Sequence, residues 1–198
     1  DYKFFIVPGI LALLVTLVGF LMSSLNIVKE KEVGTIEQLN VSPIKKYQFI
    51  LSKLIPFWVL GLFVMTIGFL ISFIVYGIYP AGSFGVGYLF AGIYLTALLG
   101  FGLLTSIYAD TQQQAMFISY FFMLIFILLG GLFAPIENMP DWAQYLTYIN
   151  PVRYFIEAMR MLVLKGSSLW DLRYHFLIVT GFAIVFNGLA ILKYKKTV

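Results

Sequence analysis

The sequence predicts an all-α integral membrane protein, a polytopic bundle of apolar helices. Of its 198 residues, 61% are hydrophobic and only 11% are charged, whereas a soluble domain carries about 25% charged residues. Mean hydropathy is +0.95, and several apolar runs exceed the roughly 18 residues that are needed to cross a bilayer. A soluble domain of this composition could not cover its surface with polar groups, so we exclude that class.

Five apolar runs predict five membrane spans. They cover residues 4–28, 47–76, 86–108, 115–134 and 174–192. As a single helix the second run would reach about 45 Å, which is longer than the roughly 30 Å hydrocarbon core. Its first turns, with Lys53 and Pro56, are therefore expected to lie in the interface and to kink into the membrane.

A polar segment, residues 29–46, separates the first two runs and has two lysines at each end. Between the lysines, apolar and acidic residues alternate at a spacing that gives a short helix one apolar and one acidic edge. Pro43 prevents this helix from continuing, because proline lacks a backbone N–H. We therefore expect a short amphipathic helix that lies flat on the cytoplasmic surface, where a soluble partner can reach it.

The distribution of basic residues predicts the orientation of the spans. Lysines gather in residues 29–46 and in the tail after residue 192, whereas the basic residues of 135–171 are mixed with acidic ones. Because cytoplasmic loops carry the excess of Lys and Arg, segment 29–46 and the tail are expected in the cytoplasm and 135–171 outside. Five spans then leave residue 1 outside the cell.

Residues 135–171 are too polar to span the membrane and too apolar for a free loop. The segment carries aromatic residues of the kind that settle at headgroup level, namely Trp142, Tyr145, Tyr148, Tyr154 and Trp170. Helix starts are expected at Pro140–Asp141 and at Asn150–Pro151. We expect one or two short helices in the outer leaflet, and their simplest role is to close the outer mouth of the bundle.

The sequence carries no recognisable catalytic motif. It has no cysteine and a single histidine, His175, so no thiolate or histidine set for a metal exists. A phosphate-binding G-x-x-x-x-G-K-[ST] loop is also missing. We therefore expect any ATP chemistry to come from another chain; an intramembrane enzyme, a channel or scaffold, and a transport subunit that is not itself an enzyme stay open at this point.

Two blocks of the sequence resemble one known family. The string EKEVGTIE from Glu30 to Glu37, with Leu39 and VSPI at 41–44, resembles the cytoplasmic signature of type 2 ATP-binding-cassette (ABC) exporter permeases. A second block resembles the segment before the last span of the same family. It comprises Gly131, Pro135, Met139, Pro140, Trp142, Asn150, Pro151, Tyr154 and Arg160. The continuation to Gly166 is similar to the bacterial branch described as multidrug exporters.

The resemblance implies a domain organisation. Such permeases have six spans, with a large extracytoplasmic domain between the first and the second. Residues 1–198 then form the C-terminal part of the transmembrane domain, with five spans present, and the first span and the extracytoplasmic domain are missing. The protein is expected in a bacterial plasma membrane, and residues 1–198 alone are expected neither to dimerise well nor to transport.

The resemblance also implies a mechanism. The polar segment becomes a coupling helix seated on a separate ABC ATPase subunit, which binds ATP and Mg, while two permease copies (a homo- or heterodimer) alternate between inward- and outward-facing states. The implied coupling residues are Glu30, Glu32, Val33, Gly34, Thr35, Ile36, Glu37 and Leu39. Their carboxylates would pair with basic groups of the ATPase, and Gly34 would allow close backbone approach. The implied cargo is hydrophobic or amphipathic, such as a drug; lipid, glycan and peptide are alternatives. No nucleic-acid partner and no metal site are implied.

Overall fold

The computed structural model describes residues 2–34 and 46–193. Within these residues every regular element is a helix, which confirms the all-α class. The elements are α1 (Tyr2–Thr16), η1 (Leu17–Met22), α2 (Ser23–Val33), α4 (Lys46–Tyr76), α5 (Phe84–Ile107), α6 (Gln112–Leu128), η2 (Ile136–Asn138), α7 (Asp141–Thr147), α8 (Pro151–Lys165) and α9 (Arg173–Lys193).

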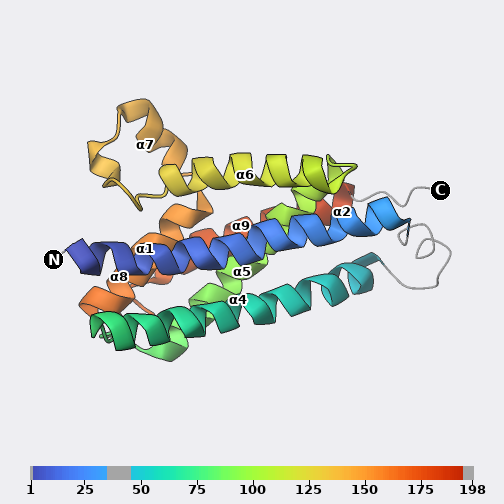
Figure 1. Cartoon of the computed structure of the whole chain (residues 1–198). Helices are drawn as coiled ribbons and strands as arrows, with labels where there is room; N and C mark the ends of the chain where they lie inside the picture. The colour runs from blue at the N-terminus through green and yellow to red at the C-terminus, as the bar shows by residue number, and fades with distance from the viewer. Residues whose placement is uncertain (1, 35–45, 194–198) are drawn as a thin grey trace.

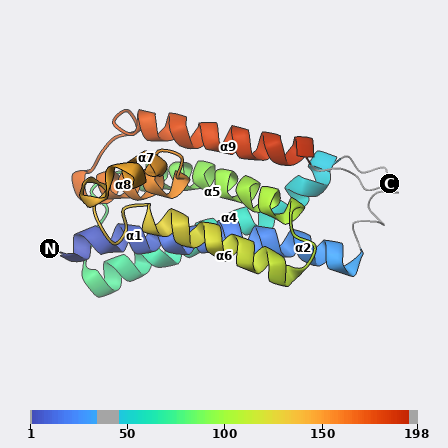
Figure 2. The ribbon, with the colours of Figure 1, turned by 90° about the horizontal axis from the view of Figure 1, so that it is seen from above.

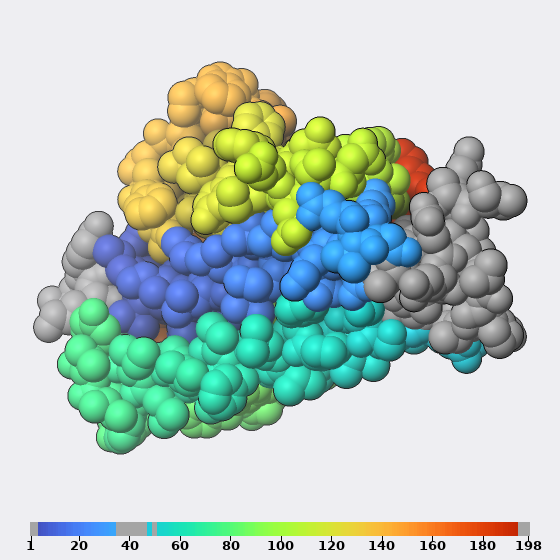
Figure 3. Space-filling view, turned by 45° about the vertical axis from the view of Figure 1, so that its right-hand side comes forward, coloured from blue at the N-terminus to red at the C-terminus, as the bar shows by residue number. Residues whose placement is uncertain are grey.

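The long helices lie side by side along one axis and alternate in direction (Figure 1). One end, which we call the lysine-rich end, carries Lys29, Lys31, Lys53 and Lys193. The other end, which we call the aromatic end, exposes Trp142, Tyr145, Tyr148, Trp170 and Tyr174. Seen from above, α5 lies between α9 on one side and α1 with α6 on the other (Figure 2), and α1 lies between α4 and α6 on the surface (Figure 3).

Within the described residues, four helical stretches are long and apolar enough to cross a membrane, by length and composition. They cover Phe4–Val33, Leu51–Tyr76, Phe84–Ile107 and Arg173–Lys193. The fourth expected span, 115–134, is shorter in the structure. It is the 17-residue helix α6, which ends at Leu128 before the pair Gly130–Gly131 and lies at the lower limit for a membrane helix. The second span is one continuous helix of 31 residues with Pro56 inside it.

The first span is a single rod with a π-helical segment in its middle. Residues Leu17–Met22 form η1, between α1 and α2. A π-helix bonds each N–H one residue further back than an α-helix does. The Ser23 hydroxyl donates to the carbonyl oxygens of Gly19 (2.8 Å) and Phe20 (3.0 Å). A side chain thus supplements the backbone hydrogen bonding at the point where the helix changes its winding.

The centre of the bundle is built on α5 and α8. Phe90, Tyr94 and Leu98 of α5 are fully buried, as are Phe155 and Met159 of α8. The rings of Tyr94 and Phe155 stack with their centroids 4.1 Å apart. The hydroxyl of a buried tyrosine needs a hydrogen-bond partner, and the Tyr94 hydroxyl lies 2.6 Å from Thr16 Oγ1. Because α8 supplies core side chains, it is packed into the helix bundle and does not lie on its surface.

The two helix starts predicted in 135–171 are confirmed. Helix α7 begins at Asp141 after Pro140, and α8 begins at Pro151 after Asn150, whose side chain accepts a hydrogen bond from the Val152 amide. The start of α8 depends on side-chain capping and on proline at its first position, whereas Pro140 before α7 makes no side-chain cap. Tyr154 differs from the other aromatic residues of the segment, because it is only 7% exposed and packs against other helices; its depth at headgroup level stays a prediction.

Candidate functional site

Three consecutive charged residues at the end of α2 attach it to three different helices. Glu30 reaches α4, Lys31 reaches α5 and Glu32 reaches α6. Successive residues of an α-helix point about 100° apart, so three in a row can face three neighbours. The end of the first span is therefore the place where the helices of the lysine-rich end are joined.

The two carboxylates of this group are occupied within the chain. Glu30 Oε1 lies 2.5 Å from Lys53 Nζ of α4. Glu32 accepts hydrogen bonds from the backbone amide (2.9 Å) and the side-chain amide (2.5 Å) of Gln112. Gln112 is the first residue of α6, so Glu32 lies at the positive end of the helix dipole. Both carboxylates hold α2 against its neighbours.

Lys31 was not among the predicted site residues. Its ammonium donates to the carbonyl oxygens of Ser106 (2.6 Å) and Ala109 (3.1 Å), with that of Ile107 at 3.4 Å. These carbonyls lie at the C-terminus of α5, where a helix carries unpaired acceptors and partial negative charge. The sequence shows the lysine but gives no sign of an acceptor 75 residues away.

Val33 and Gly34, the other two predicted coupling residues that the structure describes, lie at the C-terminus of α2. Val33 is 67% exposed, and Gly34 has a φ of +76° in the left-handed C-cap position. No atom of the described residues lies within 4 Å of the place of a Cβ on Gly34. Conformation therefore explains this glycine, since such a φ suits a residue without Cβ. Close approach to a partner stays a prediction.

The prediction of a separate surface helix over 29–46 is wrong for its first residues, 29–33. Residues 29–33 continue α2 without a break, because the packing of α2 against other helices outweighs the change to a polar composition. The coupling residues Thr35, Ile36, Glu37 and Leu39 lie outside the described residues.

At the aromatic end, the predicted block joins α6, α8 and the start of α1. Asn150 donates from its side-chain amide to the Phe126 carbonyl at 2.7 Å. Arg160 donates to the Gly131 carbonyl at 2.9 Å, and its guanidinium lies 3.7 Å from the centroid of the Phe5 ring, in cation–π geometry. These contacts fix α8 between the two helices.

The other predicted members of this block shape the loop before α8. Gly131 and Pro135 flank the turn out of α6, and the Met139 carbonyl accepts a hydrogen bond from the Gln144 side chain at 2.9 Å. The Tyr154 hydroxyl donates to the Tyr148 carbonyl at 3.0 Å. Trp142 points outward and is 67% exposed.

A charged cluster that sequence reasoning missed connects α8 to α9. Glu157 accepts from Arg153 Nε at 2.9 Å and lies 3.2 Å from His175 Nε2, and Arg153 also bonds Thr147. Burial raises the pKa of the Glu157 carboxyl, but hydrogen bonds from His175 and Arg153 more than offset this, so the pKa lies below its ordinary value. The i, i+4 spacing of Arg153 and Glu157 was the only available signal.

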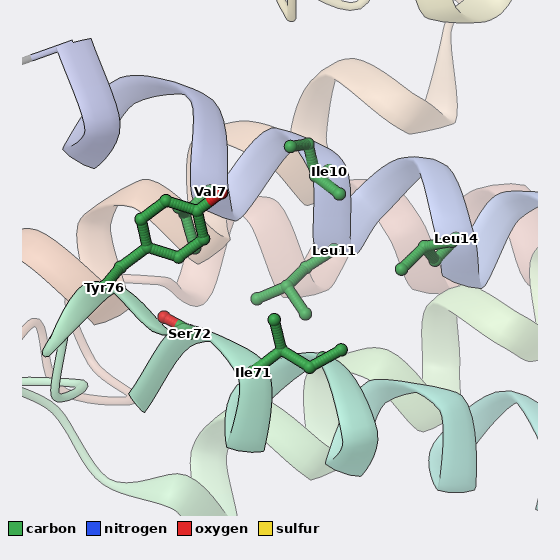
Figure 4. Close-up of a pocket in the computed structure, with 8 residues that line it drawn as sticks. Val7, Ile10, Leu11, Leu14, Ile71, Ser72 and Tyr76 are labelled. Atoms are coloured by element: carbon green, nitrogen blue, oxygen red, sulfur yellow. The ribbon is translucent and has the colours of Figure 1, made fainter. Parts of the chain in front are cut away.

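Two hollows lie along α4. The first has a volume of about 120 Å³ and lies between α1 and α4, where Ile10, Leu11 and Leu14 face Ile71 and Ser72 (Figure 4). This is below the roughly 300 Å³ of small drug sites. The second, of about 440 Å³, lies between α4 and α5 and is lined in part by Trp58 and Tyr88. Both have predominantly apolar walls.

Comparison with known proteins gives a consistent set of relatives. The profile of the ABC-2 family transporter protein matches residues 1–192. The probable multidrug ABC transporter permease YbhR of Escherichia coli (strain K12) is 40% identical over 184 residues, which are 91% of this chain and 50% of the relative. YbhS of the same organism, described in the same words, is 33% identical over 193 residues, 97% of this chain and 51% of the relative. The putative transport permease ycf38 of Cyanophora paradoxa is 28% identical over 209 residues, covering 99% of this chain and 71% of its own. The chain thus spans about half the length of the two Escherichia coli relatives.

Proposed function

Because the chain belongs to the ABC-2 family of transporter proteins, we propose that it is the membrane-spanning part of an ATP-driven exporter. In this proposal two permease copies move a hydrophobic or amphipathic compound out of a bacterial cytoplasm across the inner membrane. A separate ABC ATPase subunit binds ATP and Mg and supplies the energy. The relatives YbhR and YbhS, which are described as probable multidrug permeases, support a drug-like cargo.

The observation that carries the coupling part is the three-way attachment of α2. Glu30, Lys31 and Glu32 bind α4, α5 and α6 immediately before segment 35–45, which the resemblance assigns to the ATPase contact. A displacement of that segment would reach three helices at once. In this proposal Glu30 and Glu32 act inside the permease, and Glu37 is the carboxylate that pairs with the ATPase.

The proposed orientation places the lysine-rich end in the cytoplasm and the aromatic end outside, which the excess of lysines favours. The cysteine-free sequence allows single cysteines to be introduced at Tyr145, which is 73% exposed, and at Gln38. In right-side-out membrane vesicles, a membrane-impermeant maleimide should label the cysteine at 145. The cysteine at 38 should react only after permeabilisation. The reverse labelling pattern would overturn the orientation.

Reversing the charge at residue 37 tests the proposed ATPase contact. Glu37→Lys replaces attraction with repulsion and should weaken co-purification of the ATPase about tenfold or more. ATP-dependent accumulation of ethidium in inverted vesicles should fall with it. Glu137→Lys makes the same change at an exposed position near the aromatic end and should alter neither quantity.

Two results would contradict this proposal. If Glu37→Lys binds the ATPase and accumulates ethidium as the unaltered protein does, residue 37 is not part of the contact. If ethidium crosses the membrane at the same rate without ATP, a channel replaces the exporter.

A further inference from the structure

The Lys31 side chain donates hydrogen bonds to backbone carbonyl oxygens of another helix end. A lysine ammonium has three N–H donors and no acceptor, and Lys31 directs them at three carbonyl oxygens, of Ser106, Ile107 and Ala109. All three belong to the C-terminal turn of α5 and the residues that follow it. The Lys31 side chain therefore binds the backbone of α5 itself, whereas Glu30 pairs with the side-chain ammonium of Lys53 on α4.

The helix that Lys31 grips is the central one. In the apolar stretch of α5, 72% is buried inside the bundle, against 28% for α4 and 17% for α9. Helix α5 makes its most extensive contact with α9, where Asn187 donates to the Thr96 carbonyl at 2.9 Å. At the lysine-rich end, Lys193 of α9 donates to the Tyr108 hydroxyl at 2.8 Å. The end of α5 is thus bonded to α9.

We propose that Lys31 is a positioning residue for energy coupling, through which movement of the segment after α2 reaches α5 and with it α9. This inference rests on the proposed exporter function. Glu30 and Glu32 reach α4 and α6, which lie on the outside of the bundle (Figure 3). Among the contacts described above for Glu30, Lys31 and Glu32, those of Lys31 are the ones that reach the buried helix α5.

The variant Lys31→Met tests this role, because methionine keeps much of the aliphatic stem and removes the donors. The variant should still fold, since α2 and α5 also meet deeper in the bundle, where Thr105 Oγ1 donates to Ser24 Oγ at 3.1 Å. Lys29→Met is the matched control, because Lys29 lies on the same helix and is exposed. Lys31→Arg is the conservative variant, since it retains a cation that can cap a helix C-terminus.

We expect Lys31→Met to keep its level in the membrane, its association with the ATPase and its rate of ATP hydrolysis. Ethidium accumulated per ATP hydrolysed should fall about tenfold, as expected for the loss of hydrogen bonds from a charged donor. Lys31→Arg should recover most of the ratio, and Lys29→Met should leave it unchanged. An unchanged ratio in Lys31→Met would overturn the inference, as would a parallel loss of folded protein and ATPase binding, which indicates a structural role.

A distance measurement separates this inference from the proposed function. Spin labels on cysteines at positions 29 and 108 report the separation of the ends of α2 and α5 in the purified permease. We expect one narrow distance distribution in the parent protein and a broad one in Lys31→Met. Equal distributions would overturn the role of Lys31 whatever the protein transports. Failure of the parent protein to bind an ATPase would instead overturn the proposed function.

Discussion

Replacing Gly102 with valine is expected to separate the first span from α5 and to cost about 3 kcal/mol of unfolding free energy. A Cβ at this position would lie 1.9 Å from Ser23 Oγ and 2.9 Å from the Phe20 carbonyl oxygen. The serine can rotate only by giving up its bonds to Gly19 and Phe20, and the backbone oxygen cannot move without the helix. Close approach of two membrane helices commonly depends on such a small residue.

Thermal denaturation in detergent, followed by the fraction of monodisperse protein, measures this effect. Gly188→Val is the matched control, because nothing lies within 4 Å of a Cβ there. It should change the unfolding free energy by less than about 1 kcal/mol. In a Gly102→Ala background, Ser23→Ala removes the nearer clash and should restore part of the stability. Equal melting of the two valine variants would show that the contact between η1 and α5 is not tight.

Replacing Glu157 with leucine is expected to cost about 3 kcal/mol, because it leaves the partly buried Arg153 guanidinium and the His175 ring without their carboxylate partner. The side chains of Arg153 and His175 are each only 17% exposed. The loss should appear as a lower melting temperature of α8 and α9 together, since the cluster connects them. Glu137→Leu removes an exposed carboxylate near the same end and should have little effect.

The same carboxylate gives a pH dependence of known sign. The pKa of Glu157 is lowered in the folded protein, and the charged or titratable groups around it include Arg153, His175, Arg160 and Tyr154. Its stabilisation is fully present above the ordinary value of 4.5 and is lost as the pH falls through the lower folded-state pKa. Glu157→Gln should therefore lack this part of the acid-induced loss of stability. A parallel pH profile for both proteins would contradict the assignment.

Features that depend on local composition could be predicted from the sequence. Apolar length located the spans, and Pro140 and Asn150 marked the starts of α7 and α8, because capping is decided within a few residues. The end of α6 was misplaced by six residues. Hydropathy continues to Ala134, but the helix stops at Leu128.

Features that depend on pairing between distant residues could not be predicted. Lys31 contacts α5 and Glu32 contacts α6 at separations of 75 to 80 residues, and one sequence holds no record of such pairs. The burial of one face of α8 could not be predicted for the same reason, because it depends on contacts with distant helices. Its aromatic residues suggested the membrane interface, yet Tyr154 and Phe155 pack against α9 and α5.

The π-helical segment sets the rotational phase of everything that follows it in the first span. A π turn contains one residue more than an α turn. Each residue of α2 therefore stands where the residue before it would stand in an uninterrupted α-helix, a difference of about 100° and 1.5 Å. Without that difference, Glu30 would stand where Lys31 stands and would turn a carboxylate toward the carbonyl oxygens of Ser106 and Ala109. Lys31 would then face the positive end of α6. The extra residue of η1 therefore determines whether Lys31 and Glu32, about two turns further along, face groups of opposite or of like charge.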